Sequence, residues 1–303
     1  MTRVVFLLVP GVHLLDLAGP AQVFSTAAGF GHPYALSYVA EQPRITTAQG
    51  LPVAADLEWP SLGPGDLIVV PGWRTTGRPG SPGIGGTVLD ALRAHHARGG
   101  TVASVCAGAE ALGRAGLLDG RTCTTHHDVQ EELARRHPKA VVVRDVLFTT
   151  DDRVITSAGI ASGIDLALHL VAVRHGPAVA ARVARQMVVY ARRNGDQPQD
   201  SVMLRHRSHL DDVVHRAQDI VDARFDRPLR LPELAAAVGV GERTLSRHFT
   251  RATGLTPLRY QQALRLERAE HLIGHGATVD AAARSVGFED PRMLRRLRGR
   301  RAP

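Results

Sequence analysis

Cys106 is the residue whose type and setting most clearly suit chemistry. It is one of two cysteines in a chain of 303 residues. The apolar run TVASV (101–105) precedes it, and the helix-forming run AGAEAL (107–112) follows it. This order is typical of a nucleophile presented at a sharp strand-to-helix turn. Three interpretations stay open: a nucleophile that turns over substrate, a thiol that senses a ligand or oxidant, and a residue kept for packing.

Asp16 and His126 are the groups expected to meet Cys106. Asp16 follows the apolar run RVVFLLV, and His126 follows the short run RTCTT. The carboxyl ends of parallel strands meet at one edge of a sheet, so a carboxylate, a thiol and an imidazole are predicted to converge there. The start of the following helix is expected to lower the pKa of Cys106. The backbone N–H of Ala107, with that of Gly72 or Trp73, is a candidate anion site.

Other cysteine and histidine residues receive plainer interpretations. Cys123 is predicted to be a strand-core residue. His126 and His127 are neighbours, and adjacent side chains on a strand point to opposite faces, so we expect no metal site. His95 and His96 are predicted to lie on a solvated helix face. The glycines of GIGG lack dinucleotide-binding spacing and no phosphate loop is present, so no cofactor is expected.

Strand and helix signals alternate over the first 190 residues or so. Short runs that are apolar on both faces suit a parallel sheet covered by helices. The predicted strands are 3–9, 34–40, 66–72, 101–105, 140–148 and 153–159, and the predicted helices are 19–28, 86–98, 107–116, 127–136 and 162–175. This order predicts an α/β doubly wound parallel sheet of the flavodoxin type. A Gly/Pro-rich loop at 71–86 follows one strand, where such folds bind ligands.

The positive charge of the chain is concentrated in its last third. Residues 205–303 hold 19 of the 37 Lys+Arg and 12 of the 29 Asp+Glu, a balance of +7 within a total of +8. Such asymmetry indicates a polyanion partner, and nucleic acid is the usual one. No apolar run is long enough for a membrane span. Pro10, Gly11 and Asp16 interrupt the apolar start, which argues against a signal peptide, so a cytoplasmic location is expected.

The character of the sequence changes after a polar segment. RRNGDQPQDS (192–201) carries Asn-Gly and Pro and is typical of a linker. From about residue 209, strand signals disappear and helical periodicity continues to the end. We therefore expect a sensor or dimerisation domain at 1–191, a linker at 192–208 and an all-α DNA-binding domain at 209–303.

Residues 230–254 have the pattern of a helix-turn-helix motif. Pro232 lies near the start of a short helix, Gly239 makes a tight turn, and Leu245 and Phe249 face inward at i, i+4 spacing. The second helix is rich in arginine, which can pair with guanine edges or phosphates. The predicted DNA-contacting residues of this helix are Arg243, Thr244, Ser246, Arg247, Thr250 and Arg251.

A second motif of the same kind occupies residues 278–300, with Gly287 at its turn. Arg292, Arg295 and Arg296 are its predicted DNA contacts. A long helix at 257–273 joins the two motifs, with Leu258, Ala263, Leu266 and Leu272 available for packing. Two such motifs can place recognition helices in successive major grooves, about 34 Å apart.

This half resembles the AraC/XylS family of transcription regulators. The matching residues are LAAAVGVGERTLSRHFTRATGLTPLRYQQALRLERAEHLI followed by AARSVGFED. The family usually continues with an aromatic-rich segment, whereas here Leu294 and Leu297 take places where aromatics are common. The resemblance therefore implies two DNA-reading motifs, of which the second is expected to be weakly anchored.

The first half resembles the ThiJ/PfpI superfamily, whose fold is like that of class I glutamine amidotransferases. The matching pieces are LLDLAGPAQVF, DLIVVPG, VASVCAGAEALGRAGLLDGRTCTTH and TSAGIASGIDLALHLV. In enzymes of that superfamily the elbow cysteine and an acid from the first loop do the work, which implies Cys106 and Asp16 here. His126 matches the histidine of the usual Thr-Thr-His-aromatic run, and His127 replaces the aromatic.

The order of the two halves resembles the GlxA-like regulators. That resemblance implies a sequence-specific DNA-binding regulator that acts on promoter or operator DNA, with a first domain that senses a small-molecule effector or forms a homodimer. The alternative is a cysteine-dependent hydratase or amidase with a basic appendage. The charge split favours the regulator, because an enzyme does not need a basic, doubled helix-turn-helix.

Overall fold

The computed structural model describes residues 1–74, 83–189, 193–199, 201–274 and 276–299. The chain divides into two compact units, Met1–Gln199 and Asp200–Pro303. Most of the predicted ligand loop (residues 75–82) and the predicted domain boundary at 191/192 lie outside the described residues. None of the helices in the described ranges has the length and apolar character needed to cross a bilayer.

A six-stranded, mostly parallel sheet forms the centre of the first unit. Its strand order is β2-β1-β5-β6-β10-β9. The strands are β1 (Thr2–Leu7), β2 (Tyr34–Val39), β5 (Leu67–Val70), β6 (Thr101–Val105), β9 (Phe148–Asp151) and β10 (Val154–Ser157). Only β9, at one edge, runs antiparallel to its neighbour β10. All four residues of β5 and of β10 are buried, as expected for strands covered on both faces.

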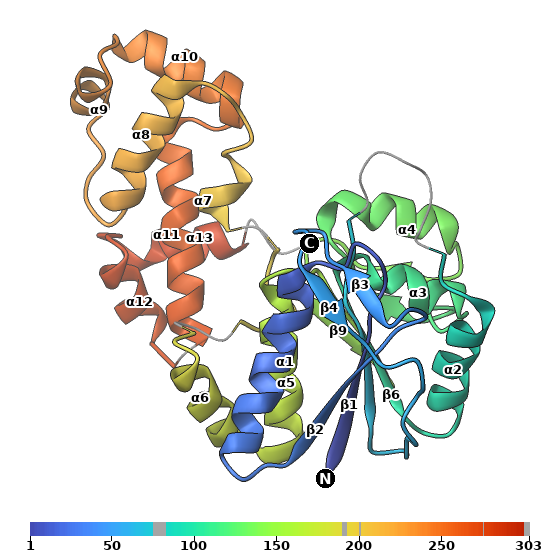
Figure 1. Cartoon of the computed structure of the whole chain (residues 1–303). Coiled ribbons are helices and arrows are strands. Elements are labelled where there is room, and N and C mark those ends of the chain that lie inside the picture. The colour runs from blue at the N-terminus through green and yellow to red at the C-terminus, as the bar shows by residue number, and fades with distance from the viewer. Residues whose placement is uncertain (75–82, 190–192, 200, 275, 300–303) are drawn as a thin grey trace. The chain divides into compact units, whose positions relative to one another are not determined.

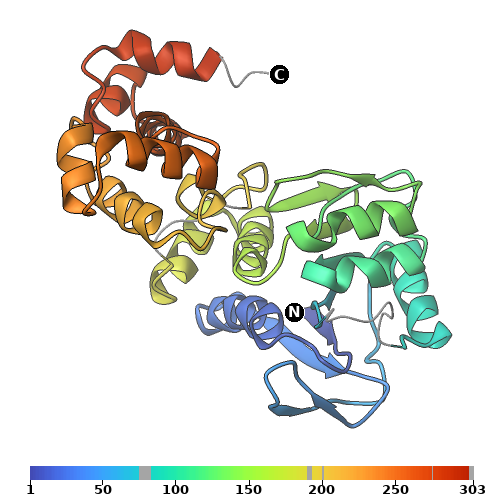
Figure 2. The same cartoon turned by 90° about the horizontal axis from the view of Figure 1, so that it is seen from above.

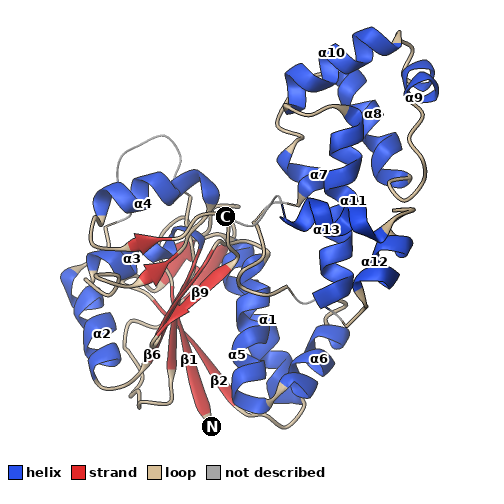
Figure 3. Ribbon diagram, turned by 180° about the vertical axis from the view of Figure 1, so that it is seen from behind, coloured by secondary structure: helices blue, strands red, loops and turns tan. Residues whose placement is uncertain are grey.

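Helices cover both faces of this sheet. The helices α1 (Leu14–Gly29), α5 (Ser162–His175) and α6 (Pro177–Gln186) lie on one face. On the other face lie α2 (Gly86–Ala97), α3 (Ala109–Arg114) and α4 (Gln130–Arg136), as the reverse view in Figure 3 also shows. Seen from above in Figure 2, the same two helix layers stand apart with strands between them. The predicted doubly wound α/β fold is confirmed.

Several local expectations for the first unit were wrong. The apolar run 140–148 is not one strand: β8 (Val141–Val142) pairs with β7 (Thr122–Cys123), and β9 begins only at Phe148. A small hairpin of β3 (Arg44–Thr46) and β4 (Pro52–Ala54) was not predicted, nor was α6. These pieces have two to ten residues, too few for hydrophobic periodicity to separate strand from loop or helix.

His95 and His96 do not lie on a solvated face. Their exposed fractions are 1% and 8%. The Nε2 atom of His95 is 3.1 Å from the carbonyl oxygen of Asp66. Burial lowers the pKa of both imidazoles, which favours their neutral form. A neutral, hydrogen-bonded ring can be buried at low cost, and this accounts for His95 but not for His96, whose buried Nε2 has no hydrogen-bond partner among the described residues.

In the second unit, the described residues form seven helices. They are α7 (Val202–Arg205), α8 (Asp212–Ala223), α9 (Leu231–Ala237), α10 (Glu242–Thr253), α11 (Pro257–Gly274), α12 (Val279–Ser285) and α13 (Pro291–Gly299). The pairs α9–α10 and α12–α13 are the two predicted motifs. Their turns contain Gly239 and Gly287 at φ of +77° and +82°, conformations that favour glycine.

Two apolar clusters hold these motifs. Leu245 and Phe249 of α10 are fully buried in the first, as predicted. Leu294 of α13 is fully buried in the second cluster. The expected weak anchoring of the second motif is therefore wrong, because this leucine packs in the core at a position where aromatic residues are common. The predicted packing role of Leu258 is also wrong, because this side chain is 54% exposed. Tyr260 and Leu264 of the same helix fill the core instead.

Candidate functional site

The backbone closes tightly around Cys106, at the turn from β6 into a short 3-10 helix. Its φ is +54°, a left-handed value that is uncommon for a residue with a side chain. A Cβ atom on Gly72 would lie 2.6 Å from the Cys106 Cβ, and one on Gly159 would lie 2.3 Å from it. Two glycines therefore form the walls, and only 8% of Cys106 is exposed.

Asp16 reaches this cysteine from the first turn of α1 and is fully buried. Its Oδ1 accepts the N–H of Ile160 at 2.8 Å, and its Oδ2 accepts the N–H of Gly72 at 3.1 Å. The same Oδ2 lies beside Cys106, since a Cβ atom on Gly72 would be 2.4 Å from it and 2.6 Å from the Cys106 Cβ. Asp16 thus joins three segments that are distant in the sequence, and the predicted meeting of Asp16 with Cys106 is present in the structure.

The expected lowering of the Cys106 pKa is wrong. Burial, followed by the neighbouring charge of Asp16, raises the pKa of the thiol to about 12, while the Ala107 N–H opposes this. Burial also raises the pKa of Asp16, against the hydrogen bonds that it accepts. A short 3-10 turn offers little dipole, whereas a buried carboxylate beside the sulfur strongly disfavours a second negative charge. The thiol form of Cys106 is therefore the stable one.

The predicted anion site is largely occupied by the protein itself. The Gly72 N–H is already used by Asp16, and the Ala107 N–H is directed at the Cys106 sulfur. Trp73 is 3% exposed and forms a bridge with Val12 rather than a wall of an open pocket. The strand-to-helix turn at Cys106, here called the elbow, therefore resembles the site of a nucleophile. Its backbone N–H donors, however, point at protein atoms and not at an open space for an anion.

His126 lies in the segment next to the elbow. Its neighbour Thr125 is fully buried and donates a hydrogen bond from Oγ1 to the carbonyl oxygen of Cys106, at 2.7 Å. The Thr125 carbonyl in turn accepts the side-chain amides of Gln130 and Gln199, at 3.2 and 2.9 Å. The imidazole of His126 contacts His127 and Asp128. The backbone of this segment is thus fixed beside Cys106.

The expectation that His126 and His127 point to opposite faces is wrong. The two residues do not lie on a strand, because His126 caps a 3-10 turn that begins at His127. Their rings lie side by side, with centroids 4.1 Å apart and planes at 31°. The alternation rule holds only for extended backbone, and the chain turns at this point.

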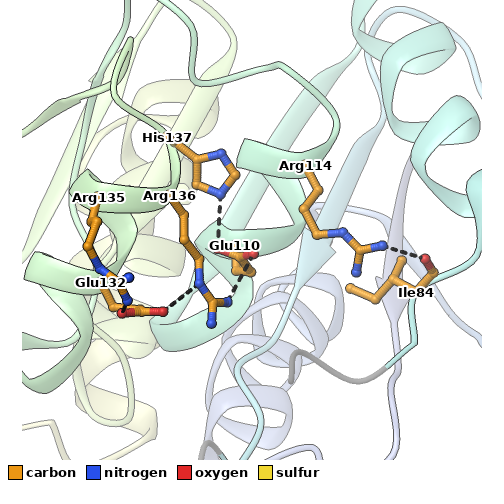
Figure 4. A network of polar contacts seen from close by, with 7 residues as sticks. All are labelled: Ile84, Glu110, Arg114, Glu132, Arg135, Arg136 and His137. Carbon is orange, nitrogen blue, oxygen red and sulfur yellow. Dashed lines mark hydrogen bonds and ion pairs between the residues drawn. The ribbon is translucent and has the colours of Figure 1, made fainter. Parts of the chain in front are cut away.

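A polar network links the helix after Cys106 to the helix after His126 (Figure 4). The carboxylate of Glu110 on α3 lies 2.9 Å from Nε2 of His137 and 3.4 Å from Nη1 of Arg136. Although burial raises the pKa of Glu110, these two partners lower it below its ordinary value. Glu132 forms ion pairs with both Arg135 and Arg136. Nearby, Arg114 donates a hydrogen bond to the carbonyl oxygen of Ile84. The network stabilises the contact between α3 and α4.

The outer face of α10 is the candidate nucleic-acid interface. Arg243, Arg247, Thr250 and Arg251 are exposed, and Thr244 and Ser246 are half-buried. Within the described part of the chain, no carboxylate lies at ion-pair distance from Arg243 or Arg247. On the opposite side, His248 Nδ1 lies 3.0 Å from Asp211 Oδ2, and Asp211 also caps α8. The helix therefore presents cations outward while its inner side is fixed.

The corresponding face of α13 is more internally paired. Arg292, Arg295 and Arg296 are all exposed. Arg295 already forms an ion pair with Asp280 at 2.8 Å, and Arg296 donates to the sulfur of Met293. A phosphate would have to compete with Asp280 for Arg295. The two helices thus differ in how much free positive charge they offer.

Several structural contacts were not anticipated from the sequence. Ile160 closes the elbow at φ +48°, and Thr125 supports it. Arg265 donates to the carbonyl oxygens of Phe225, Arg227 and Gly287 at 2.6 to 2.7 Å, which ties the loop before the first helix-turn-helix motif to the turn of the second. The only sequence signal for the turn at Ile160 was the glycine beside it in SAGIASG. Nothing in the residue pattern marked the carbonyls that Arg265 binds.

Two family models match the chain. The model of the DJ-1/PfpI family matches residues 2–173, and that of a helix-turn-helix domain matches residues 234–301. Each match falls within one of the two structural units described above.

Three curated relatives are similar to large parts of the chain. The HTH-type transcriptional regulator CdhR of Pseudomonas aeruginosa is 29% identical over 290 residues, 94% of this chain and 84% of that protein. The regulator GbdR of the same species is 35% identical over 185 residues, 60% of this chain, and the match spans only about half of its length (49%). The isonitrile hydratase of Pseudomonas putida is 34% identical over 173 residues, 54% of this chain and 68% of that enzyme.

Proposed function

The chain belongs to the DJ-1/PfpI family and carries an AraC-type helix-turn-helix unit, and from this membership we propose that it is a sequence-specific DNA-binding transcription regulator. The observation that carries the proposal is the exposed arginine face of α10, built over the buried Leu245 and Phe249. The named function of CdhR, which matches nearly the whole chain, supports it.

The chemistry of that face suits duplex DNA. Arg243 and Arg247 lie one helical turn apart on an exposed surface, where their guanidinium groups can reach base edges or phosphates. The balance of +7 over residues 205–303 adds a sequence-independent attraction for the phosphate backbone. Base contacts then supply the specificity that the charge alone cannot.

Selection of bound fragments from a genomic library by the full chain, followed by fluorescence anisotropy over a salt series, tests the proposal. We expect enrichment of a discrete sequence whose affinity falls steeply with salt, because phosphate contacts release counterions. Binding that is equally tight for scrambled duplexes of the same length would argue for a non-specific basic surface. Absence of binding to every duplex would remove the proposal.

The DJ-1/PfpI unit is proposed to act as the effector-sensing and dimerisation part of the regulator. The resemblance to regulators of this domain order supports this role, and a cytoplasmic location follows from a DNA partner. Sedimentation velocity of the full chain tests the homodimer: a monomer at micromolar concentration would contradict it. A change in operator affinity on addition of a small molecule would support effector binding.

The relation to isonitrile hydratase makes an enzyme the second candidate function. Two features of the elbow argue against turnover: the thiol has a pKa of about 12, and the Gly72 N–H is directed at Asp16. A nucleophilic cysteine needs an accessible thiolate near neutral pH. We therefore propose that Cys106 is not a catalytic residue. Turnover of an isonitrile that is lost in Cys106→Ala would reverse this assignment.

A further inference from the structure

His126, His127 and Asp128 bring three groups that metals prefer to one place. The Nδ1 atom of His126 is 3.6 Å from Oδ2 of Asp128, and the Nε2 atom of His127 is 3.3 Å from its Oδ1. One ligand atom from each residue lies within 4.8 Å of the others. Among the described residues, this is the one group of three or more such side chains with that property.

These separations are close to those that a tetrahedral zinc ion requires. With metal–ligand distances of about 2.0–2.1 Å, two ligand atoms of a tetrahedron are about 3.3–3.4 Å apart. The two measured nitrogen–oxygen distances, 3.3 and 3.6 Å, differ from this by a few tenths of an ångström at most. The two distances reach different oxygens of Asp128, and the ligand atoms of the three residues all lie within 4.8 Å of one another, so side-chain rotation has to bring the three groups onto one ion.

The lone pair of His126 already faces the cluster. Its Nδ1 accepts a long hydrogen bond of 3.4 Å from the Asp128 N–H, which requires that this nitrogen carry no proton. An ion at this position would compete with this long hydrogen bond. His127 and Asp128 have side chains that are 49% and 74% exposed, so an ion can enter from solvent and keep water in its remaining positions.

The backbone below the cluster is fixed in advance. Thr125 is held by its hydrogen bond to the Cys106 carbonyl and by the amides of Gln130 and Gln199. Gln130 begins α4 two residues after Asp128. Ligands carried by a fixed segment lose less conformational entropy when they bind an ion. We propose that His126, His127 and Asp128 form a binding site for a divalent transition metal of the zinc type, with its open positions filled by water.

Two other histidine pairs provide internal comparisons. His32 and His175 have ring centroids 4.6 Å apart, and His209 and His215 have theirs 4.2 Å apart. Ring proximity is thus shared by all three pairs. His215 Nε2 is engaged with the His209 carbonyl, and His209 Nε2 with Gln218. Only the pair at 126 and 127 belongs to a group that also contains a carboxylate, within the part of the chain that the structure describes.

The test is titration of the chelator-stripped full chain with Zn²⁺ alone, followed by calorimetry and by competition with a chromophoric chelator. We expect one Zn²⁺ per chain. His127→Ala and Asp128→Asn should each weaken binding by about tenfold or more, because each removes one of three ligands. His32→Ala is the matched control and should leave the affinity unchanged. Co²⁺ substitution should give the weak visible absorption of nitrogen and oxygen ligands, without a thiolate charge-transfer band.

Three outcomes would overturn the proposal. The first is no saturable binding of Zn²⁺, Ni²⁺ or Co²⁺. The second is an affinity that His127→Ala and Asp128→Asn leave unchanged. The third is an affinity that is lost in His32→Ala. His127 and Asp128 are exposed, so the variants are expected to fold, which circular dichroism checks. The inference does not depend on DNA binding, and the two fail independently.

Discussion

The backbone N–H of Ile160 donates a hydrogen bond to Oδ1 of Asp16 over 2.8 Å, although the residues are 144 positions apart. Ile160 has a φ of +48°, a conformation that a β-branched side chain rarely adopts. Such strain persists only where surrounding contacts hold it. Asp16 therefore has a structural task in addition to its position beside the Cys106 thiol.

Asp16→Ala should destabilise the first unit by about 1–3 kcal/mol or more, because the N–H groups of Ile160 and Gly72 lose their buried acceptor. Urea unfolding followed by tryptophan fluorescence measures this. Asp90→Ala removes a carboxylate with a side chain that is 69% exposed and should change stability by less than about 0.5 kcal/mol. Equal midpoints for the two variants would show that Asp16 has no such role.

The Cys106 thiol should react slowly at neutral pH. With a pKa of about 12, about one thiol in ten thousand is ionised at pH 8. Alkylation by iodoacetamide in a Cys123→Ala background should therefore accelerate about tenfold per pH unit up to at least pH 10.5. A plateau reached near pH 8 would show that the elbow lowers the pKa instead.

The same raised pKa predicts how stability depends on pH. The folded chain keeps the Cys106 proton to about pH 12, whereas the ordinary thiol value is 9.0, so the folded state binds more protons between these values. The free energy of unfolding should be unaffected by this group below pH 9 and should fall as pH rises above 9. Cys106→Ala should reduce that fall. An identical alkaline profile for both proteins would contradict the assignment.

Gly159→Ala should disrupt the elbow. The new Cβ would lie 2.3 Å from the Cys106 Cβ, and the φ of +109° is unfavourable for alanine. We expect a loss of about 1–3 kcal/mol, the range for overpacked cores. Gly29→Ala, in α1 with open space around it, is the control and should change stability by about 1 kcal/mol or less, toward higher stability. The difference between the two thermal midpoints measures the effect.

Arg247→Ala should weaken specific DNA binding and lower the slope of log K against log salt by about one phosphate contact. If Arg247 pairs with a base edge, discrimination should fall by about 1–3 kcal/mol at one position of the site. Arg216→Ala on α8, whose partner is Asp212, removes the same charge outside the two motifs. Equal losses for both variants would mean that only net charge matters.

Arg265→Met should destabilise the second unit, because one guanidinium serves three carbonyl oxygens at 2.6 to 2.7 Å. Each hydrogen bond to a charged group contributes about 1.5–3 kcal/mol, and the three are not independent. We expect a total of about 2–5 kcal/mol. Arg259→Met, exposed on the same helix, is the matched control. If Arg265→Met lowers the free energy of unfolding no more than Arg259→Met does, apolar packing alone holds the two motifs together.

The parts predicted well from the sequence are those in which local pattern and burial agree. Leu245 and Phe249 have helical spacing and face the core, and Gly239 and Gly287 sit at left-handed turns. Cys123 lies in a buried strand as expected. In each case the pattern within a single helix, turn or strand is enough to predict the position, without knowledge of the residues that pack against it.

The parts that failed depend on contacts between distant residues. His95 is a polar residue, but its imidazole can be buried because it forms a hydrogen bond with the Asp66 carbonyl oxygen. The pKa of Cys106 is raised first by burial and then by the charge of Asp16, 90 positions earlier, and an argument from the local helix includes neither. Leu258 has the right spacing for packing but lies in the first turn of α11, on its exposed side. Periodicity identifies a face, and only the folded chain shows what covers it.

The joint at Arg265 also has a consequence for how the second unit unfolds. Each helix-turn-helix has its own small apolar cluster, and Phe225 packs against both. Gly287 contacts the Asp226 carbonyl so closely that a Cβ there would lie 1.8 Å from that oxygen. Neither cluster is large enough to be stable alone. The two motifs should therefore melt in a single cooperative transition, and a chain truncated after the first motif should fail to keep that motif folded.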